Sequence, residues 1–250
     1  MSKERIDKLM VEQQLAPTRQ RAQALLMAGQ VLVDDTAVTK AGTLVSRVAA
    51  IRIRGEQNPY VSRGGLKMAG ALDLLHIDVS QKIVLDIGAS TGGFTDCCLQ
   101  KGALKSYAVD VGTNQLVYSL RTDARVVSYE QTNARDITPE LFDPPPNFAV
   151  IDVSFISITK LLQPVVDCLS ASADILAMVK PQFEVGKDKV GKGGVVRSDA
   201  DRMAAVEKVK ACAIELGLEV IAQAESVISG PKGNREVFVH FKKRICPDTP

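Results

Sequence analysis

An apolar run, a glycine-rich turn, an amphipathic stretch and a second apolar run follow one another between Lys82 and Asp110, where the chain reads KIVLDIGASTGGFTDCCLQKGALKSYAVD. The first run, residues 83–87, has the length and the β-branched side chains of a strand that is buried on both faces of a parallel sheet. Each apolar run carries an acidic residue near its end, Asp86 in the first and Asp110 in the second. The segment therefore predicts a strand, a helix and a second parallel strand, the repeating unit of a layered α/β fold.

The turn after the first strand contains three glycines, Gly88, Gly92 and Gly93. Glycine lets the backbone turn tightly and approach a ligand closely. Because Ser90 stands where the dinucleotide fingerprint G-x-G-x-x-G has its second glycine, the clamp on a diphosphate is missing. Asp110 lies 24 positions after Asp86, a spacing at which a carboxylate can accept hydrogen bonds from ribose hydroxyls. The turn therefore suits a nucleoside ligand without phosphate, such as S-adenosylmethionine, whose cationic end would favour a nearby carboxylate.

The same turn also fits G-x-S-x-G, the nucleophile elbow of hydrolases, with Ser90 as the nucleophile. A hydrolase of this kind needs a histidine as well, and the chain contains only His76 and His240. His240 sits within an apolar strand, where a core or surface role is expected rather than a catalytic one. The hydrolase alternative is therefore disfavoured, although the turn alone does not exclude it.

The composition is that of an ordinary globular protein, with 46% hydrophobic and 24% charged residues. No stretch approaches the roughly 18 apolar residues that span a bilayer, and the charged N-terminus lacks the apolar core of a secretory signal. With 4% aromatic residues and no amphipathic helix that has an aromatic face, a membrane-lytic protein is disfavoured. The five cysteines show no CxxC spacing, which indicates reduced thiols. We expect a cytoplasmic protein without bound metal, and we favour a monomer.

Charge is distributed unevenly along the chain. Residues 1–67 carry 11 Lys and Arg against 6 Asp and Glu, a net charge of +5, whereas the remainder carries 20 against 23, a net charge of −3. A basic N-terminal module on a nearly neutral body is typical of an attachment that binds a polyanion. Solvated surface charge explains so small an excess nearly as well.

The first 55 residues predict a separate small unit. A helix over residues 6–16 is followed by Thr18 as the N-cap of a second helix, residues 19–28, and by Gly29 as the C-terminal cap of that helix. Short strands are expected at 31–33, near 38 and at 51–53.

Within this unit, residues 5–38 resemble the S4 RNA-binding domain in the stretch RIDKLMVEQQLAPTRQRAQALLMAGQVLVDDTAV. The matching pattern is a two-helix entry, a helix that ends in Gly, and a V-x-V hairpin. Asp34-Asp35 replaces the usual Asn-Gly turn. The resemblance implies binding of structured RNA through phosphate contacts from basic side chains, for which the candidates are Arg5, Arg19 and Arg21. The alternative is a small helical cap that only packs on the rest of the chain.

A polar linker at 56–61 separates this unit from a second domain at 62–245, where strand-like and helix-like runs alternate. Strands are expected near 83–87, 105–110, 126–129, 147–153, 174–179, 219–226 and 235–242. Helices are expected at 68–75 and near 94–101, 114–121, 157–169 and 199–216. The alternation predicts an α/β fold with a doubly wound, mostly parallel, Rossmann-like sheet. Because no helix separates the last two strands, they should form an antiparallel hairpin at one edge, as in class I methyltransferases.

Four charged residues stand at the ends of predicted strands or at a helix start. Lys67 is expected to open the helix before the sheet, Asp152 and Lys180 to end two strands, and Glu236 to begin the last strand. The carboxyl ends of parallel strands converge on the ligand crevice of a doubly wound sheet, and the start of an antiparallel strand reaches the same rim. Taken singly, Asp152 and Lys180 suit a structural role as well as a catalytic one.

Residues 61–242 resemble the FtsJ-type ribose 2′-O-methyltransferases, whose signature is a Lys-Asp-Lys-Glu tetrad. The motifs VSRGGLK, DVSF, VKPQFE and NREVF supply Lys67, Asp152, Lys180 and Glu236. With the S4-like unit in front, the chain resembles the TlyA family, often labelled hemolysin-like. The resemblance implies an S-adenosylmethionine-dependent enzyme that methylates a ribose 2′-hydroxyl of ribosomal RNA. The implied cofactor-binding residues are Asp86, Gly88, Ser90, Gly92, Gly93, Phe94, Asp110 and Asn133. At the position of Asn133 the family usually has Asp.

A ribose hydroxyl is a poor nucleophile, so its attack on a methyl group needs a positioned proton acceptor. The implied tetrad would supply that acceptor. Lys180 is the candidate: as a neutral amine it would accept the proton, and as an ammonium it would stabilise the developing alkoxide with help from Asp152. The sequence leaves both roles open. The glycine-rich, basic stretch 186–197 predicts a mobile loop. Its candidate RNA contacts are Lys187, Lys189 and Lys192, and Arg63 of the motif VSRGGLK is a further candidate. A non-catalytic RNA-binding or ribosome-assembly protein remains an alternative.

Overall fold

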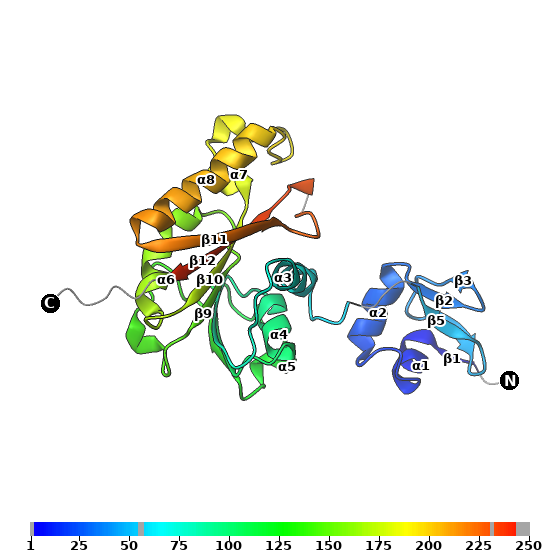
Figure 1. Cartoon of the computed structure of the whole chain (residues 1–250). Helices are drawn as coiled ribbons and strands as arrows, with labels where there is room; N and C mark the ends of the chain where they lie inside the picture. The colour runs from blue at the N-terminus through cyan, green and yellow to red at the C-terminus, as the bar shows by residue number, and fades with distance from the viewer. Residues whose placement is uncertain (1–2, 55–57, 231–232, 244–250) are drawn as a thin grey trace. The chain divides into compact units, whose positions relative to one another are not determined.

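In the computed structural model, residues 3–54, 58–230 and 233–243 are described, and the chain divides into two compact units between residues 57 and 58 (Figure 1). Part of the expected linker and the end of the expected second domain, at 245, lie outside the described residues.

The smaller unit consists of two helices and five short strands: β1 (Lys3–Arg5), α1 (Ile6–Glu12), α2 (Arg19–Met27), β2 (Val31–Val33), β3 (Thr36–Ala37), β4 (Leu44–Ser46) and β5 (Ile51–Ile53). Thr18 caps α2 as predicted, since its hydroxyl accepts a hydrogen bond from the Arg21 amide at 3.2 Å. Asp34 and Asp35 both have positive φ, 46° and 64°, so they form the turn with the twist that a tight hairpin needs. Strand β2 pairs antiparallel with β3 and β5, and β1 pairs with β4. The β1–β4 pair was not predicted.

The larger unit is built on a seven-stranded sheet: β6 (Ile83–Ile87), β7 (Lys105–Val109), β8 (Val126–Tyr129), β9 (Phe148–Ile151), β10 (Asp174–Val179), β11 (Leu218–Glu225) and β12 (Val237–Lys243). Their order is β11-β12-β10-β9-β6-β7-β8. The pairs from β10 to β8 are parallel, whereas β12 is antiparallel to both of its neighbours. This arrangement confirms the mostly parallel doubly wound sheet with an antiparallel hairpin at one edge.

Six helices accompany the sheet: α3 (Arg63–Leu74), α4 (Gly93–Gln100), α5 (Tyr118–Arg121), α6 (Leu162–Cys168), α7 (Pro181–Glu184) and α8 (Asp199–Glu215), with short 3₁₀ turns at Pro139–Leu141, Ile158–Lys160 and Lys187–Lys189. Figure 1 shows α3, α4 and α5 on one side of the sheet and α6 and α8 on the other. No helix in the described ranges is long and apolar enough to cross a membrane.

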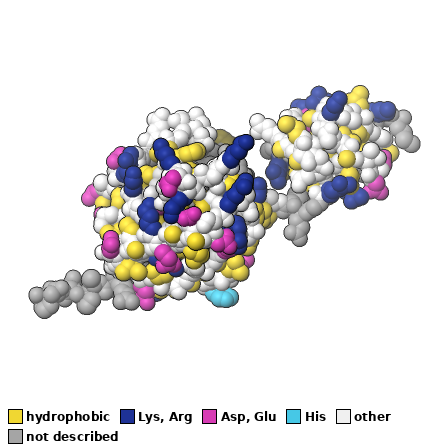
Figure 2. Space-filling view, turned by 90° about the horizontal axis from the view of Figure 1, so that it is seen from above, with side chains coloured by type: hydrophobic (Ala, Val, Ile, Leu, Met, Phe, Trp, Pro, Cys, Tyr) yellow, Lys and Arg dark blue, Asp and Glu magenta, His cyan; other side chains and the backbone are white. Residues whose placement is uncertain are grey.

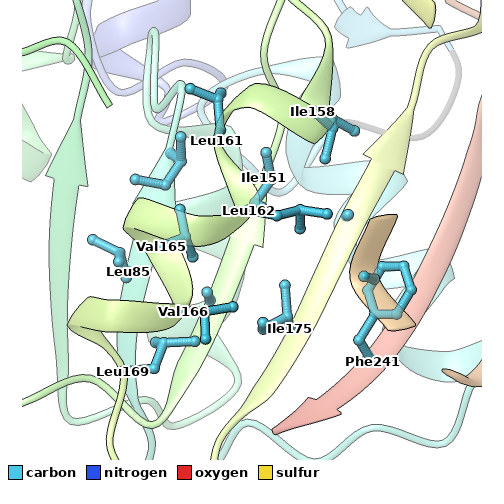
Figure 3. Packing of buried hydrophobic residues seen from close by; sticks show 14 of the residues in the cluster. Leu85, Ile151, Ile158, Leu161, Leu162, Val165, Val166, Leu169, Ile175 and Phe241 are labelled. Carbon is cyan, nitrogen blue, oxygen red and sulfur yellow. The ribbon is translucent and has the colours of Figure 1, made fainter. Parts of the chain in front are cut away.

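The two faces of the sheet bury separate apolar cores. In β9, Phe148 and Val150 contribute to the core beneath α3 and α4, and Ala149 and Ile151 to the core beneath α6 and α8. Figure 3 shows side chains of the second core, where Leu162, Val165 and Val166 of α6, and Leu169 directly after it, face the strands. Burying one such side chain contributes about 1.5–3 kcal/mol, so these contacts hold the strand ends, and the loops that follow them, in place.

The helix before the sheet differs from the prediction, because α3 begins at Arg63 rather than at Met68. Ser62 caps it by accepting a hydrogen bond from the Gly64 amide at 3.3 Å. Close packing accounts for Gly65 in this helix, because a Cβ atom there would lie 2.2 Å from Cβ of Tyr60. Lys67 therefore lies in the second turn of the helix and does not open it. The helix expected at 114–121 is shorter than predicted and comprises only α5, and that at 157–169 is a 3₁₀ turn followed by α6.

Candidate active site

A cavity of about 550 Å³ opens at the carboxyl ends of the parallel strands. All four predicted catalytic residues line it: Lys67 from α3, Asp152 after β9, Lys180 after β10, and Glu236 before β12. The sheet explains why residues so far apart in sequence meet here. Val179 at the end of β10 pairs with Val237 at the start of β12, which places Lys180 and Glu236 at the same rim.

Lys180 and Asp152 form an ion pair, with Nζ 2.5 Å from Oδ1 of Asp152. Nζ also donates a hydrogen bond of 3.1 Å to Oγ of Ser154. Both lysine and aspartate side chains are mostly shielded from solvent, 12% and 22% exposed, so the attraction between them is less screened than that of a surface pair. The amine of Lys180 is thus held at the cavity wall by two oxygen atoms from the loop after β9.

Lys67 and Glu236 form a second ion pair, in which the lysine ammonium donates to Oε2 of the carboxylate. Both side chains are buried, at 11% and 0% exposure. The other carboxylate oxygen, Oε1, has no hydrogen-bond partner among the described residues. Burying an ion pair costs desolvation free energy, and here one carboxylate oxygen is enclosed as well as unpartnered.

A second cavity of about 420 Å³ adjoins the first and shares with it the residues Gly88, Ser90, Asp152, Ser154 and Phe155. Asp110 lines this second cavity and also holds the glycine-rich turn. Its Oδ2 accepts from the Ser90 amide at 2.8 Å, and its Oδ1 accepts from the Gly112 amide at 2.7 Å. The predicted turn and the predicted acidic residue therefore form one hydrogen-bonded rim around the second cavity.

The predicted turn glycines serve different purposes. Gly88, which lines both cavities, has φ of +85°, and a Cβ atom there would lie 2.4 Å from the Asp152 carbonyl oxygen. Only glycine therefore fits at this position. Gly92 lines neither cavity, and a Cβ there would meet the Leu120 side chain at 2.3 Å. Phe94 lines the first cavity, as does Gly93.

Asn133 lines the second cavity as predicted for a ligand-facing residue. Its side-chain oxygen accepts a hydrogen bond of 3.1 Å from the Arg135 amide. The oxygen is therefore engaged by the turn of the chain itself, and the amide nitrogen is the group that Asn133 can offer to a ligand.

Asp86, predicted to bind the cofactor, lines neither cavity. It is completely buried, and its Oδ2 accepts from the amide and the hydroxyl of Thr95 at 3.0 and 2.7 Å. Burial raises the pKa of Asp86 to about 7, and the charges of Asp152 and Asp110 add to that rise. In this structure Asp86 supports the start of α4 from below the turn.

An Asp86→Asn variant is expected to remove a pH dependence from the stability of the larger unit. The pKa of Asp86 is about 7 in the folded chain and about 3.9 in an unfolded one. Its proton therefore stabilises the fold fully below pH 4, and this stabilisation is lost as the pH rises through 7. Between pH 5 and pH 8 the wild-type free energy of unfolding should fall about 2–3 kcal/mol further than that of the variant.

Urea unfolding followed by tyrosine fluorescence measures this difference in the full chain. All four tyrosines, Tyr60, Tyr107, Tyr118 and Tyr129, belong to the larger unit, so the signal reports that unit alone. The same pH dependence in both proteins would contradict a raised pKa for Asp86.

The hydrolase alternative fails on the position of its histidines. His240 pairs with Asp174, with Nε2 3.0 Å from Oδ1, and Asp174 begins β10. Ser90 follows the carboxyl end of β6, whereas Asp174 lies at the amino end of the parallel strand β10, so the two residues are at opposite ends of the strands. His76 lines a separate cavity beside Lys101. No hydrogen bond joins Ser90 to a histidine in the described part of the chain, so the turn is not a nucleophile elbow.

Sequence reasoning missed three residues that shape the site: Ser154, Phe155 and Asn234. Phe155 is 92% exposed and borders both cavities. Asn234 is buried; its Nδ2 donates to the Gly194 carbonyl at 2.8 Å, and its Oδ1 accepts from the Val196 amide at 3.1 Å. Ser154 and Phe155 belong to the motif DVSF and Asn234 to NREVF, so their places beside Asp152 and Glu236 were the available signals.

The basic stretch at 186–197 borders the first cavity through Val190 and Gly194. An isolated antiparallel bridge joins Gly191 and Val195, and Asn234 ties the stretch to the start of β12. These hydrogen bonds join the stretch to the site, and the mobility expected from its composition stays a prediction.

The predicted RNA contacts lie in several settings. In the smaller unit, Arg5 and Arg19 both pair with the buried carboxylate of Asp7, at 3.0 and 2.9 Å, and remain about half exposed. In the larger unit, Arg63 lines the first cavity, and Lys189 pairs with Asp201 at 2.7 Å. Figure 2 shows further Lys and Arg side chains on the surface of each unit, with Asp and Glu between them on the larger one. Positive charge is therefore present on both units, although part of it is paired internally.

Comparison with known families identifies both units. The FtsJ-like methyltransferase family matches residues 60–243, and the S4 domain matches residues 4–48. The first match covers the whole described sheet with both cavities.

Three similar proteins span nearly the whole chain. The 16S/23S rRNA (cytidine-2′-O)-methyltransferase TlyA of Mycobacterium tuberculosis is 44% identical over 95% of this chain and 89% of its own length. Hemolysin A of Brachyspira hyodysenteriae is 43% identical over 95% of this chain and 99% of its own. A solved structure from Streptococcus thermophilus, described as a candidate hemolysin, is 43% identical and covers 100% of this chain and 90% of its own, with a TM-score of 0.76.

Proposed function

The chain belongs to the TlyA family of FtsJ-like methyltransferases, and on that premise we propose that it transfers a methyl group to a ribose 2′-hydroxyl of ribosomal RNA. The observation that carries the proposal is the meeting of Lys67, Asp152, Lys180 and Glu236 in one cavity that adjoins a second, nucleoside-sized one. The Mycobacterium tuberculosis relative is named for this reaction on cytidine. The S4 domain supports RNA as the substrate.

We propose S-adenosylmethionine as the methyl donor, held mainly in the second cavity. Asp110 stands at its rim, where a carboxylate can accept from ribose hydroxyls, and Asn133 can donate from its amide nitrogen. The carboxylates of Asp152 and Asp110 are close enough to raise the pKa of Asp86, so a positively charged ligand would relieve their mutual repulsion. Bound there, the cofactor supplies a methyl group on a cationic sulfur atom.

Lys180 is proposed to hold and activate the acceptor hydroxyl. Its amine faces the first cavity and lies 2.5 Å from the Asp152 carboxylate. The hydroxyl oxygen would bond to the methyl carbon as the bond from that carbon to the cationic sulfur breaks and the sulfur leaves as a neutral thioether. The hydroxyl proton can pass to Lys180 while Asp152 takes a proton from the ammonium, so the released proton ends on the Asp152 carboxylate. Positioning of the hydroxyl at this pair can supply a large share of the rate, because correct orientation converts an encounter into an intramolecular reaction.

The Lys67–Glu236 pair is proposed to place the ribose from the opposite wall. Its ammonium is turned toward the carboxylate, and Oε1 of Glu236 lacks a partner among the described residues. That oxygen is enclosed, so the part of the pair that a ribose can reach is the Lys67 side chain, which is 11% exposed and can donate to a sugar oxygen. The pair would then fix the sugar while Lys180 acts on the 2′-hydroxyl.

Incorporation of labelled methyl from S-adenosylmethionine into ribosomal RNA or ribosomal subunits tests the proposal. We expect incorporation that depends on the enzyme and is blocked by S-adenosylhomocysteine. Cofactor binding without incorporation into naked RNA or either subunit would favour the non-catalytic alternative, an RNA-binding protein of ribosome assembly.

Removing residues 1–57 is expected to separate the two activities of the chain. The larger unit keeps both of its apolar cores, so its cofactor Kd should change less than threefold. Its Kd for ribosomal RNA should rise at least tenfold, because the phosphate contacts of the S4 domain are lost. Filter binding at fixed salt and calorimetry with the cofactor measure the two constants. Equal losses of both would contradict a division of labour between the units.

A membrane-lytic activity, which the name of the Brachyspira relative raises, has less support. The site described above serves group transfer, and the described helices include none suited to cross a membrane.

A further inference from the structure

The loop at 152–157 leaves β9 and carries three cavity residues, Asp152, Ser154 and Phe155. It has no regular secondary structure, and Phe155 adopts a positive φ of 66° with its ring almost fully exposed. A loop of this kind does not by itself hold a side chain at one position. The Asp152 amide donates to the Ile87 carbonyl oxygen at 2.9 Å, so β6 holds the start of the loop. Contacts from outside the loop must fix the rest of it, and with it the path of the chain beside the Asp152 carboxylate.

The short helix α7, which follows Lys180, contacts the loop at three successive places. Lys180 pairs with Asp152 at the cavity. One turn further on, the ring of Phe183 packs against that of Phe155, with centroids 5.2 Å apart. At the end of the helix, Glu184 reaches the far end of the loop. The first two contacts border the cavity, and only the third lies outside it.

Glu184 makes the third contact with both oxygens of a buried carboxylate. Oε1 accepts from the Ile158 amide at 2.7 Å, and Oε2 accepts from the Ser157 hydroxyl at 2.5 Å. The side chain is 1% exposed, and the Lys208 ammonium lies 3.7 Å from Oε2. Lys208 also donates to the Glu184 carbonyl oxygen at 2.8 Å, so α8 anchors the same end of α7.

We infer that Glu184 is a positioning residue for methyl transfer, which fixes the loop at 152–157 to α7 and thereby sets Asp152 relative to Lys180. The inference rests on the proposed function of that pair. Glu184 touches neither cavity, so it acts through the loop. Hydrogen bonds that a carboxylate accepts from a backbone amide and a hydroxyl are strong and directional. Breaking them leaves the buried Ile158 amide without an acceptor, while the Ser157 hydroxyl keeps a contact of 2.7 Å with Thr159.

Two substitutions separate the positioning role from the charge. In Glu184→Gln, the amide oxygen can still accept from Ile158, and the amide nitrogen can donate to the Ser157 hydroxyl, so the loop should stay fixed. In Glu184→Ala both bonds are lost. Ser157→Ala removes only one of them and provides a milder variant if Glu184→Ala does not fold.

Hydrogen exchange of the segment 153–161, measured by mass spectrometry on the full chain, reads the position of the loop without any need for activity. We expect faster exchange in Glu184→Ala, an intermediate rate in Ser157→Ala, and a rate near wild type in Glu184→Gln. Glu207→Ala, which removes an exposed glutamate on α8, is the matched control and should not change the rate. Unchanged exchange in Glu184→Ala and Ser157→Ala would overturn the inference.

Turnover provides the second measurement. At saturating RNA and cofactor, kcat should fall on the order of tenfold to a hundredfold in Glu184→Ala, and Glu184→Gln should restore most of it. Val209→Ala creates a cavity in the core beneath α8, and this variant controls for an effect of lost stability on kcat. An equal fall in kcat in Val209→Ala would overturn the positioning role. If the wild type transfers no methyl group, the proposed function fails, while the exchange measurement still decides whether Glu184 fixes the loop.

Discussion

Replacing Lys180 with methionine is expected to lower kcat for methyl transfer about 10²–10⁴-fold, the usual contribution of a positioned proton-transfer group. Methionine keeps much of the length and apolar stem of lysine and removes the amine. Asp152 then loses the ion-pair partner 2.5 Å away, and the acceptor hydroxyl loses the group that orients it. Cofactor binding should persist, because Lys180 does not line the second cavity.

The matched control is Lys101→Met, which removes a lysine paired with Asp73 at 2.8 Å on the surface of the same unit. This control should keep its kcat within about twofold, since an exposed pair contributes little. Steady-state methyl transfer at saturating RNA and cofactor gives kcat for the two variants. A kcat within threefold of wild type in Lys180→Met would contradict the role assigned to the amine.

The second large effect concerns the buried pair of Lys67 and Glu236. Lys67→Met leaves the fully buried carboxylate unpaired, and Glu236→Leu leaves a largely buried ammonium without its partner. Each single change should lower the free energy of unfolding by about 3–5 kcal/mol. The double variant, in which two apolar side chains replace the pair, should recover most of that stability. All three variants should lose methyl transfer, because the polar wall of the cavity is gone.

Urea unfolding followed by tyrosine fluorescence gives the three free energies and the coupling between the two positions. A coupling of several kcal/mol, with a stable but inactive double variant, would show that the pair is kept for function rather than for stability. Additive losses in the double variant would contradict this account. A fully active double variant would remove the pair from the site.

The larger unit could be predicted well because its strands are short apolar runs bounded by polar residues and turns. The bounds of β6, β8 and β10 agree with the sequence prediction. The edge hairpin followed from the lack of a helix between its strands. The start of α3 was placed five residues too late. Glycine is a poor helix former, so Gly64 and Gly65 give no local signal for a helix, and Gly65 is required by a tertiary contact, the close packing of Tyr60.

In the candidate site, too, local sequence patterns predicted the positions of residues, whereas their tertiary contacts could not be predicted. Strand ends and motifs placed the four charged residues at one rim, and the structure shows how they pair, which depends on contacts 169 positions apart for Lys67 and Glu236. Asp86 was expected to bind the cofactor; its carboxylate accepts hydrogen bonds from Thr95 below the turn, and the expected contact with the cofactor stays a prediction. Glu184 is the last residue of the motif VKPQFE, but the motif did not indicate its role, because its partners Ser157 and Ile158 lie in a different part of the chain.

The most direct test of the central claim is the chemical position of the transferred methyl group. Ribosomal RNA labelled by the enzyme is digested to nucleosides and, separately, treated with alkali. We predict a ribose-methylated nucleoside and an alkali-resistant dinucleotide, because a 2′-O-methyl group blocks cleavage of the adjacent phosphodiester bond. Label on a base, with complete alkaline cleavage, would contradict methyl transfer to the ribose and the role given to the Lys180–Asp152 pair.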